Sequence, residues 1–255
     1  MVSYGRFAQV YDELMSDVPY DQWVSFTKNR LRESSIAVKN IADLGAGTGE
    51  ITLRLDEEGF NMTGIDVSEE MLTIAHQKSL QSQSTIQWLQ MDITNLNTSA
   101  TYDAVVCFCD VVNYLTDIHQ VEAFMNNAYQ LLAPGGKLIF DVHSTGYVQD
   151  FLANQTFGAV TDDISYIWFC EEGLTPYTVS HDLTFFVREG NKYERFDEVH
   201  HQRTFSVETY VESVQEAGFQ LCSVHGDFSD EEGFDEKEHD RIFFVCEKPL
   251  NKEEA

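Results

Sequence analysis

Basic residues are scarce in this chain. Among its 255 residues, 16 are lysine or arginine and 43 are aspartate or glutamate, which gives a formal net charge of −27. The basic residues are scattered and form no visible patch. Because so acidic a surface repels nucleic-acid phosphates and anionic lipids, both are disfavoured as partners. We therefore expect no membrane partner.

Long apolar runs and paired cysteines are missing as well. No apolar run approaches the roughly 20 residues that a transmembrane helix needs. The opening segment MVSYGRFAQVYDELM lacks the basic-then-apolar order of a signal peptide. The five cysteines form no C-x-x-C pair, and four lie in apolar, strand-like runs where a reduced thiol packs as a small hydrophobic group. These features predict a cytoplasmic protein with reduced cysteines.

Metal-ligand patterns are also lacking. The acidic segment 227–240 has eight acids and one lysine, but an EF-hand calcium loop beginning at Asp227 would need a glycine where Glu232 stands. His200 and His201 lie on opposite faces of a predicted strand, so they cannot chelate one ion together. We expect a solvated acidic loop and no bound metal.

What the sequence does contain is a glycine-rich turn. Residues 41–55 read IADLGAGTGEITLRL, in which glycines alternate at Gly45, Gly47 and Gly49 between an apolar run and a helical pattern. Only glycine combines unusual φ values with room for a ligand against the backbone. The free N–H groups of the following helix would face that ligand. The pattern predicts a strand, a tight turn and a helix N-terminus that together bind a nucleotide-like molecule.

Two other interpretations of this turn are weaker. The dinucleotide fingerprint G-x-G-x-x-G requires glycine where Glu50 stands, and a carboxylate there would face a pyrophosphate. A nicotinamide-dependent oxidoreductase is therefore disfavoured. A tight turn without a ligand is the remaining alternative, but three alternating glycines are a costly way to build one.

Acids end the next two predicted strands. Asp66 lies 21 residues after Gly45, about the separation at which an acid reaches a ribose diol, and Ser68 is predicted to cap the following helix. Asp92 ends the third strand. Taken singly, a strand-terminal aspartate is more often a helix cap or a loop anchor.

These motifs together resemble those of a known family. The pattern D-x-G-x-G-x-G from Asp43 to Gly49 resembles motif I of the class I S-adenosylmethionine-dependent methyltransferases, and LxPGG ahead of an apolar strand is also typical of them. The resemblance covers residues 40–142 and rejoins near the C-terminus. The segment FAxxYDxLM, from Phe7 to Met15, resembles the N-terminal arm of the YqeM-like branch of small-molecule methyltransferases.

The resemblance implies that S-adenosylmethionine binds at the turn and leaves as S-adenosylhomocysteine. Asp66 is expected to accept from the ribose hydroxyls, Asp92 to accept from the adenine amino group, and Tyr4 and Tyr11 to close over the methionyl end. The implied cofactor-binding residues are Tyr4, Tyr11, Asp43, Gly45, Ala46, Gly47, Gly49, Asp66, Val67, Met71, Met91, Asp92, Ile93 and Cys109.

The expected fold is α/β. It is a Rossmann-like, seven-stranded mixed sheet with an antiparallel last strand, flanked by helices, with an N-terminal helical arm and an antiparallel β insert after the fifth strand. Gly190-Asn191 is a two-residue hairpin signal within that insert. We expect a single domain, 1–255, made of a helical cap (1–35), a cofactor-binding core (36–142), the β insert over the substrate site (143–205), and a C-terminal helix with the last two strands (206–255).

Methyl transfer requires an aligned acceptor, exclusion of water and, for some acceptors, removal of a proton. Strand alternation places Glu198, His200 and Gln202 on one face and Asp197, His201 and Arg203 on the other, and one face should look into the cleft. The candidate catalytic residues are Asp110, His143, His200 and Arg203. The candidate substrate contacts are Asn113, Tyr114 and Gln202. Each has a structural alternative, such as turn capping for Asp110 or an ion pair with a sheet acid for Arg203.

The function that these observations favour is methyl transfer to a small molecule. N-methylation is favoured over O-methylation because the insert resembles the lids of amine-methylating relatives. An RNA-modifying methyltransferase and a non-catalytic, S-adenosylmethionine-binding regulatory protein are the alternatives. Monomer and homodimer both stay open.

Overall fold

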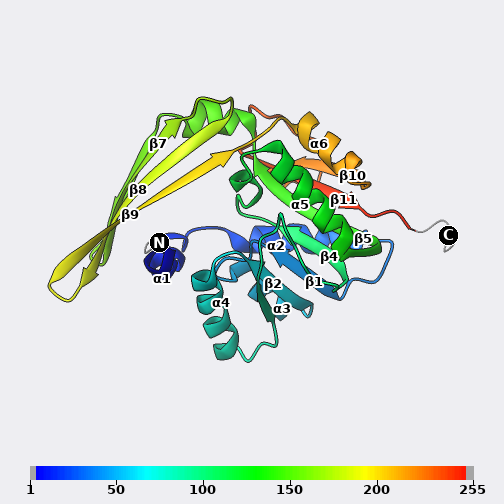
Figure 1. The fold of residues 1–255 in the computed structure, drawn as a ribbon, viewed down its shortest axis with the longest axis horizontal. Coiled ribbons are helices and arrows are strands. Elements are labelled where there is room, and N and C mark those ends of the chain that lie inside the picture. Colours follow the sequence, from blue (N-terminus) through cyan, green and yellow to red (C-terminus); the bar gives the residue numbers. More distant parts are fainter. Residues whose placement is uncertain (1–3, 251–255) are drawn as a thin grey trace.

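A seven-stranded sheet lies at the centre of the molecule (Figure 1). The structure is a computed structural model that describes residues 4–250, and the side chains of residues 4–7 and 9 lie outside the described part. The strand order is β10-β11-β5-β4-β1-β2-β3. Its strands are β1 (Asn40–Leu44), β2 (Asn61–Asp66), β3 (Gln87–Gln90), β4 (Tyr102–Cys107), β5 (Leu132–His143), β10 (Gln220–Gly226) and β11 (Arg241–Glu247). Strand β11 runs antiparallel to both β10 and β5, and the other neighbouring strands pair in parallel, which confirms the expected mixed Rossmann-like architecture.

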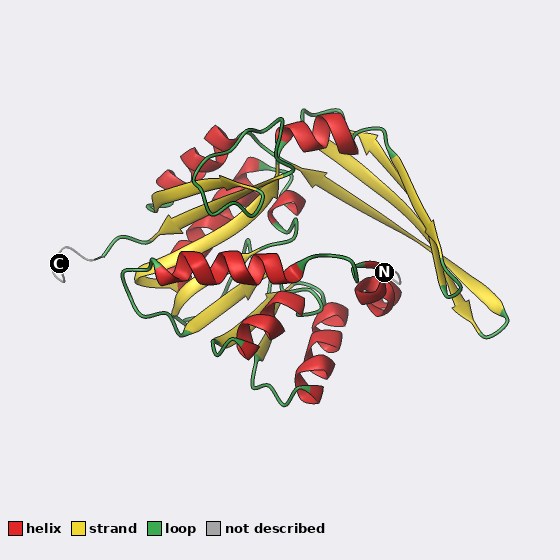
Figure 2. Cartoon of the chain, turned by 180° about the vertical axis from the view of Figure 1, so that it is seen from behind, coloured by secondary structure: helices red, strands yellow, loops and turns green. Residues whose placement is uncertain are grey.

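Helices cover both faces of this sheet (Figure 2). Apolar side chains of α2 and α3 pack with Ile41, Val106 and Phe243 on one face, and those of α5 and α6 pack with Leu44 and Phe244 on the other. The helices are α1 (Tyr4–Leu14), α2 (Tyr20–Arg32), α3 (Glu50–Glu57), α4 (Glu69–Gln81), α5 (Ile118–Leu131) and α6 (Val207–Glu216), with one-turn segments η1 (Val112–Tyr114) and η2 (Tyr147–Leu152). No helix within residues 4–250 is long and apolar enough to cross a membrane.

Local signals set the helix starts. The Ser68 hydroxyl accepts a hydrogen bond from the Met71 N–H, as the expected cap of α4 should. Asp117 and Gln120 form a capping box at α5, which sequence analysis had not identified. Helix α5 ends at Leu131, and β5 begins directly at Leu132. The register of the pairing between β5 and β4 shifts at the PGG segment.

A second, four-stranded antiparallel sheet forms the insert, in the order β6-β7-β8-β9. Its strands are β6 (Thr156–Val160), β7 (Ile164–Glu172), β8 (Thr178–Glu189) and β9 (Lys192–Arg203). The hairpin at Gly190-Asn191 is present, since Glu189 pairs with Lys192. Strand β6 was not predicted, because TFGAV is short, contains a glycine and does not alternate clearly. The insert sheet arches from the end of β5 and extends as a twisted ribbon beyond α1 (Figures 1 and 2).

Candidate functional site

A cavity of about 650 Å³ lies between the carboxyl ends of the parallel strands and the insert sheet. Residues from α1, the β1–α3 turn and the ends of β2 to β5 line one half, and residues from η2, β7, β8 and β9 line the other. Ligands in open α/β sheets bind at this carboxyl edge. The elements that sequence analysis assigned to the cofactor and to the insert therefore meet at one site.

The three glycines of the turn have different surroundings. A Cβ on Gly45 would lie 2.4 Å from the Val111 methyl groups, so this glycine permits close backbone packing. A Cβ on Gly47 would meet nothing within 4 Å, and its φ of +55° lies in the left-handed region. A Cβ on Gly49 would lie 2.7 Å from Trp88, and Gly49 does not line the cavity. Gly49 is thus a packing residue at the N-cap of α3 rather than part of the cavity wall.

Asp66 is fixed at the end of β2 by two backbone donors. Its Oδ2 accepts from the Gly47 N–H and its Oδ1 from the Ser68 N–H, both at 2.8 Å. Burial raises the pKa of this carboxyl, against the effect of the backbone donors. Since a carboxylate oxygen can accept more than one hydrogen bond, both oxygens can still receive hydroxyl donors from the cavity. The arrangement suits recognition of a diol.

Asp43 lies beneath the turn and is 3% exposed. Its Oδ2 accepts from the Thr52 hydroxyl at 2.6 Å. Burial raises its pKa to about 7, although the bond from Thr52 opposes that change. Asp43 therefore lines the floor of the cavity as a carboxyl that is partly protonated near neutral pH.

Apolar side chains line the next part of the cavity. Val67, Met71, Met91 and Ile93 come from the ends of β2 and β3 and the start of α4. Beside them, Asp92 Oδ1 accepts from the Thr94 N–H and hydroxyl, at 2.8 and 2.7 Å. Asp92 thus anchors its own turn, and its other oxygen is available for the adenine contact that the resemblance implies.

These residues fit S-adenosylmethionine. A rigid carboxylate suits the ribose diol, an apolar slot suits the adenine ring, and the open backbone at Gly47 leaves space for the methionyl chain. Ala46 and Cys109 also line the cavity. The side chain of Tyr4 lies outside the described part, so its predicted contact stays a prediction.

The N-terminal arm covers this end of the cavity. Tyr11 lines the cavity, and burial raises its pKa well above the usual value. The neighbouring Asp12 accepts from the Thr48 hydroxyl at 2.6 Å and pairs with Lys78 at 2.5 Å. Lys78 also pairs with Glu50 at 2.7 Å. These contacts hold α1 against the first turn of α3 and against α4.

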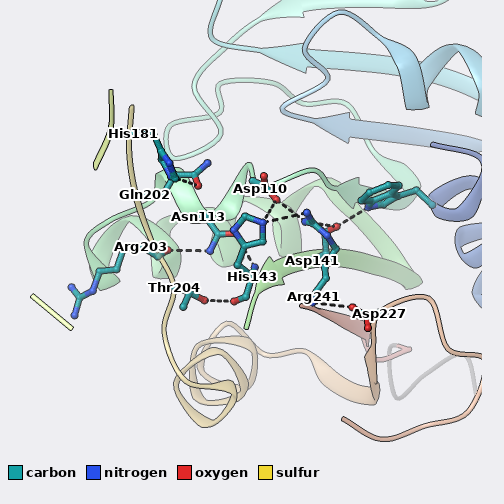
Figure 3. Close-up of polar contacts among 11 residues, drawn as sticks. Asp110, Asn113, Asp141, His143, His181, Gln202, Arg203, Thr204, Asp227 and Arg241 are labelled. Carbon is teal, nitrogen blue, oxygen red and sulfur yellow. Dashed lines mark hydrogen bonds and ion pairs between the residues drawn. The ribbon is translucent and has the colours of Figure 1, made fainter. Parts of the chain in front are cut away.

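A buried charge network lies where the two halves of the cavity meet (Figure 3). Asp110 Oδ1 lies 2.7 Å from Arg241 Nη1 and 3.0 Å from His143 Nε2. Arg241 Nη1 also contacts Asp141 Oδ2 at 3.1 Å, and the Trp23 indole donates to the same oxygen at 2.7 Å. Arg241 Nη2 approaches His143 Nε2 at 3.3 Å.

The network sets the charge of its members. Burial would raise the pKa of Asp110, but Arg241 and His143 outweigh it and hold that pKa well below its usual range. Burial does raise the pKa of Asp141, despite Arg241. Asp110 has a φ of +69°, which is rare for a residue other than glycine. The contacts of the surrounding network hold Asp110 in this unfavourable backbone conformation.

One face of β9 in the insert sheet contributes residues to the cavity. Strand alternation had placed these residues together. His200 and Gln202 line the cavity, whereas His201 on the opposite face is exposed. The Tyr114 hydroxyl lies 3.5 Å from His200 Nδ1. Glu198 shares that face and is buried, but it does not line the cavity.

Two predicted acceptor-site residues lie elsewhere. Arg203 donates to the Thr116 carbonyl at 3.2 Å and stacks 4.3 Å from the Phe205 ring centroid, away from the cavity lining. Asn113 is 1% exposed, donates to the Arg203 carbonyl and accepts from the His143 N–H. Asn113 therefore positions β9 and His143. Neither residue lines this cavity, and the catalytic role of Arg203 and the substrate contact of Asn113 stay predictions. Alternation already separates Arg203 from His200 and Gln202.

Sequence analysis missed several cavity residues. Arg241 opens β11 and meets Asp141 across 100 positions of sequence, so no local pattern indicates it. His181 was detectable, since it alternates with Val179 and Leu183 on an apolar strand face. The aromatic residues missed are Tyr20, Phe108, Tyr147, Tyr166, Trp168 and Phe185. Within residues 4–250, no cluster of three or more histidines, cysteines or acids is arranged to hold a metal.

Comparisons with known proteins agree with this geometry. The methyltransferase domain family matches residues 41–136. The chain is 45% identical over 246 residues to the putative methyltransferase YqeM of Bacillus subtilis (strain 168), covering 96% of this chain and 97% of that one. It resembles the crystal structure of an S-adenosylmethionine-dependent methyltransferase from Clostridium acetobutylicum, with TM-score 0.87, 28% identity and coverage of 96% and 99%.

A more distant relative has a named substrate. The chain is 27% identical over 267 residues to the glycine/sarcosine/dimethylglycine N-methyltransferase of Actinopolyspora halophila. That similarity spans 98% of this chain but 43% of the relative.

Proposed function

We propose that this chain, which belongs to the YqeM-like family of S-adenosylmethionine-dependent methyltransferases, methylates an amine nitrogen of a small molecule bound under the insert sheet. The observation that carries the proposal is the second half of the cavity, which continues past the residues suited to the cofactor and is closed by β7, β8 and β9. A cavity of about 650 Å³ lies in the range of small-molecule sites.

The cofactor half has a defined set of contacts. Asp66 would hold the ribose, Asp92 with Met91 and Ile93 the adenine, and Tyr11 the methionyl end. When bound, S-adenosylmethionine supplies an electrophilic methyl group. The chain contributes alignment and exclusion of water, and the arm and the insert sheet cover the site from two sides.

The charge of the cavity favours a cationic acceptor. Among the side chains that the structure describes, five acids and one arginine line it, and that arginine, Arg241, is paired with Asp110 and Asp141. The acids are Asp43, Glu50, Asp66, Asp92 and Asp110. Aromatic faces in the acceptor half attract an ammonium group further. An amine therefore suits this half better than an anionic acceptor.

A protonated amine must lose a proton before its lone pair can attack. Asp110 stays ionised and lies 3.0 Å from His143 Nε2. In the tautomer whose Nε2–H donates to Asp110, His143 Nδ1 carries the lone pair that accepts that proton. Asp110 would orient the ring and stabilise the imidazolium that forms. Tyr147 packs 4.9 Å from the His143 ring and restricts it further.

The similarity to a glycine/sarcosine/dimethylglycine N-methyltransferase supports transfer to nitrogen. We place the reaction in the cytoplasm, because the cysteines are unpaired and three of the five are buried as thiols. A net charge of −27 argues against an RNA acceptor.

The test is a methyl-transfer screen with isotope-labelled S-adenosylmethionine and matched panels of small amines and of the corresponding alcohols and phenols. We expect N-methylated products by mass spectrometry. For the amine that is methylated, His143→Gln should lower kcat by about 10²–10⁴-fold with unchanged cofactor affinity. His201→Gln, on the exposed face of β9, is the matched control. Methylation of hydroxyls alone would reject the amine assignment.

A further inference from the structure

Three side chains on the cavity face of the insert sheet form a hydrogen-bonded row. The Trp168 indole on β7 donates to His181 Nδ1 at 3.0 Å. His181 Nε2 on β8 lies 3.1 Å from Gln202 Oε1 on β9. His181 is 4% exposed, and all three residues line the cavity. The row is a preorganised polar element in an otherwise aromatic wall.

The chemistry of the indole fixes the protons along this row. An indole nitrogen can only donate, so His181 Nδ1 must carry a lone pair. The Cys170 thiol lies 3.4 Å from the same nitrogen and can also donate to it. A neutral imidazole with an unprotonated Nδ1 carries its proton on Nε2. His181 therefore donates to Gln202, and the amide atom that receives this bond is the oxygen.

The neutral state of His181 has its own causes. Burial, together with the nearby His143 and His200, lowers the pKa of His181 to about 4, although Gln202 and Asp110 act in the opposite direction. Protonation at Nδ1 would also turn an N–H group against the Trp168 N–H. The row thus keeps one arrangement of protons across the neutral pH range.

We infer that Trp168 and His181 are positioning residues that lock the Gln202 amide with its oxygen toward His181 and its N–H2 group toward the acceptor. The Gln202 N–H2 group then donates a hydrogen bond to an uncharged oxygen atom, such as a carbonyl, ether or hydroxyl oxygen, on the molecule that is methylated. A carboxylate is disfavoured by the acids of the cavity. This assignment rests on the proposed function only in placing the acceptor under the insert sheet.

The lock is tested by long-range ¹H–¹⁵N spectra of histidine-labelled protein, with His181 assigned from His181→Asn. We expect the tautomer with the proton on Nε2, unchanged between about pH 5.5 and 8. Trp168→Phe keeps an aromatic ring but deletes the indole N–H donor. The two neutral tautomers of His181 should then both be populated, and the pKa of His181 should rise. Trp88→Phe deletes an indole donor that binds Ser79 instead and should change nothing at His181. A proton on Nδ1 in the wild type would overturn the lock.

The ligand class is tested by titrating the wild-type protein, saturated with S-adenosylhomocysteine, and following the Gln202 side-chain N–H2 resonances. Dimethyl sulfoxide, which accepts but cannot donate, should shift these resonances saturably. Methylammonium, which donates but cannot accept, should not. In Trp168→Phe the dimethyl sulfoxide shift should fall at least threefold, since the amide can then turn over. Equal responses to both probes, or none to dimethyl sulfoxide, would overturn the inference.

The two proposals fail separately. Both NMR readouts are independent of turnover, so an absent amine product with an intact lock would reject the proposed function alone. With an amine product in hand, Gln202→Ala should raise the acceptor KM about tenfold with little change in kcat. A fall in kcat at unchanged KM would reject the binding role of Gln202.

Discussion

At the residue scale, Asp66 shows how one side chain serves both the fold and the site. Each of its oxygens binds a backbone N–H from a different loop, one in the glycine turn and one ahead of α4. These bonds fix the carboxylate before any ligand arrives, which lowers the entropy that binding must overcome.

Replacing Asp66 with alanine should weaken S-adenosylmethionine binding about 100-fold. A charged acceptor for two hydroxyls contributes about 1.5–3 kcal/mol per hydrogen bond, and part of that loss is recovered by water. Calorimetry of cofactor binding provides the measurement. Asp103→Ala is the control, because Asp103 also accepts from two backbone N–H groups but at the opposite end of the sheet. Unchanged affinity in the Asp66 variant would contradict the ribose assignment.

Asp43 should make stability fall as pH rises. Burial raises its pKa from 3.8 to about 7, so the folded state holds a proton that the unfolded state releases between those values. The free energy of unfolding therefore decreases from about pH 4 to pH 7. Asp43→Asn removes this ionisation. The free energy of unfolding of the variant, relative to wild type, should therefore rise by on the order of 3 kcal/mol from pH 4 to pH 8.

Denaturant unfolding at each pH measures this difference. Asp103→Asn is the matched control for replacing an aspartate that accepts from backbone N–H groups. A constant difference between Asp43→Asn and wild type would show that Asp43 ionises normally in the folded protein.

At the scale of elements, Asp12 ties α1 to the rest of the molecule. It contacts Thr48 and Lys78, and the following residues Leu14 and Met15 line the cavity beside Tyr11. A short helix that packs on the outside of a domain opens more readily than the central sheet that it covers. We therefore expect α1 to control how long the cofactor stays bound.

Asp12→Ala should speed dissociation of S-adenosylhomocysteine about tenfold. It removes one hydroxyl bond and one charged pair, and hydrogen bonds to charged groups contribute about 1.5–3 kcal/mol. Stopped-flow dissociation measures the rate, and hydrogen exchange should rise in residues 4–14. Glu13→Ala, an exposed neighbour on the same helix, should leave both unchanged. If Asp12→Ala dissociates at the wild-type rate, α1 is not a closing element.

At the scale of the whole molecule, the excess of negative charge affects the stability of the fold. With a net charge of −27, repulsion between surface carboxylates opposes the folded state unless salt screens it. Within the part of the chain that the structure describes, most ion pairs are local or surface contacts, which contribute little individually.

Raising the salt concentration from about 0.01 to about 0.5 M should therefore raise the melting temperature by several degrees, because the screening length shrinks from about 30 Å to below 8 Å. A gain of 1 kcal/mol corresponds to about 2–4 °C for a chain of this size. Scanning calorimetry in sodium and in potassium chloride separates screening from specific ion binding. A lower melting temperature in salt would mean that attractive pairs prevail over repulsion.

The sequence by itself determined the Rossmann-like order of elements and the cofactor half of the cavity. Glycine turns, strand-terminal acids and the Ser68 cap depend on backbone rules that act over a few residues. Strand alternation likewise placed His200 and Gln202 on one face of β9 and His201 on the other.

Only the tertiary structure decided how the acceptor half is built. Arg241 joins Asp110 and His143, Trp168 joins His181 and Gln202, and Arg203 is directed away from the cavity toward Thr116. These contacts connect strands of different sheets or distant loops, and no spacing along the chain encodes them. Local sequence sets the conformation of each segment, whereas the partner of a buried polar group depends on which segments pack together.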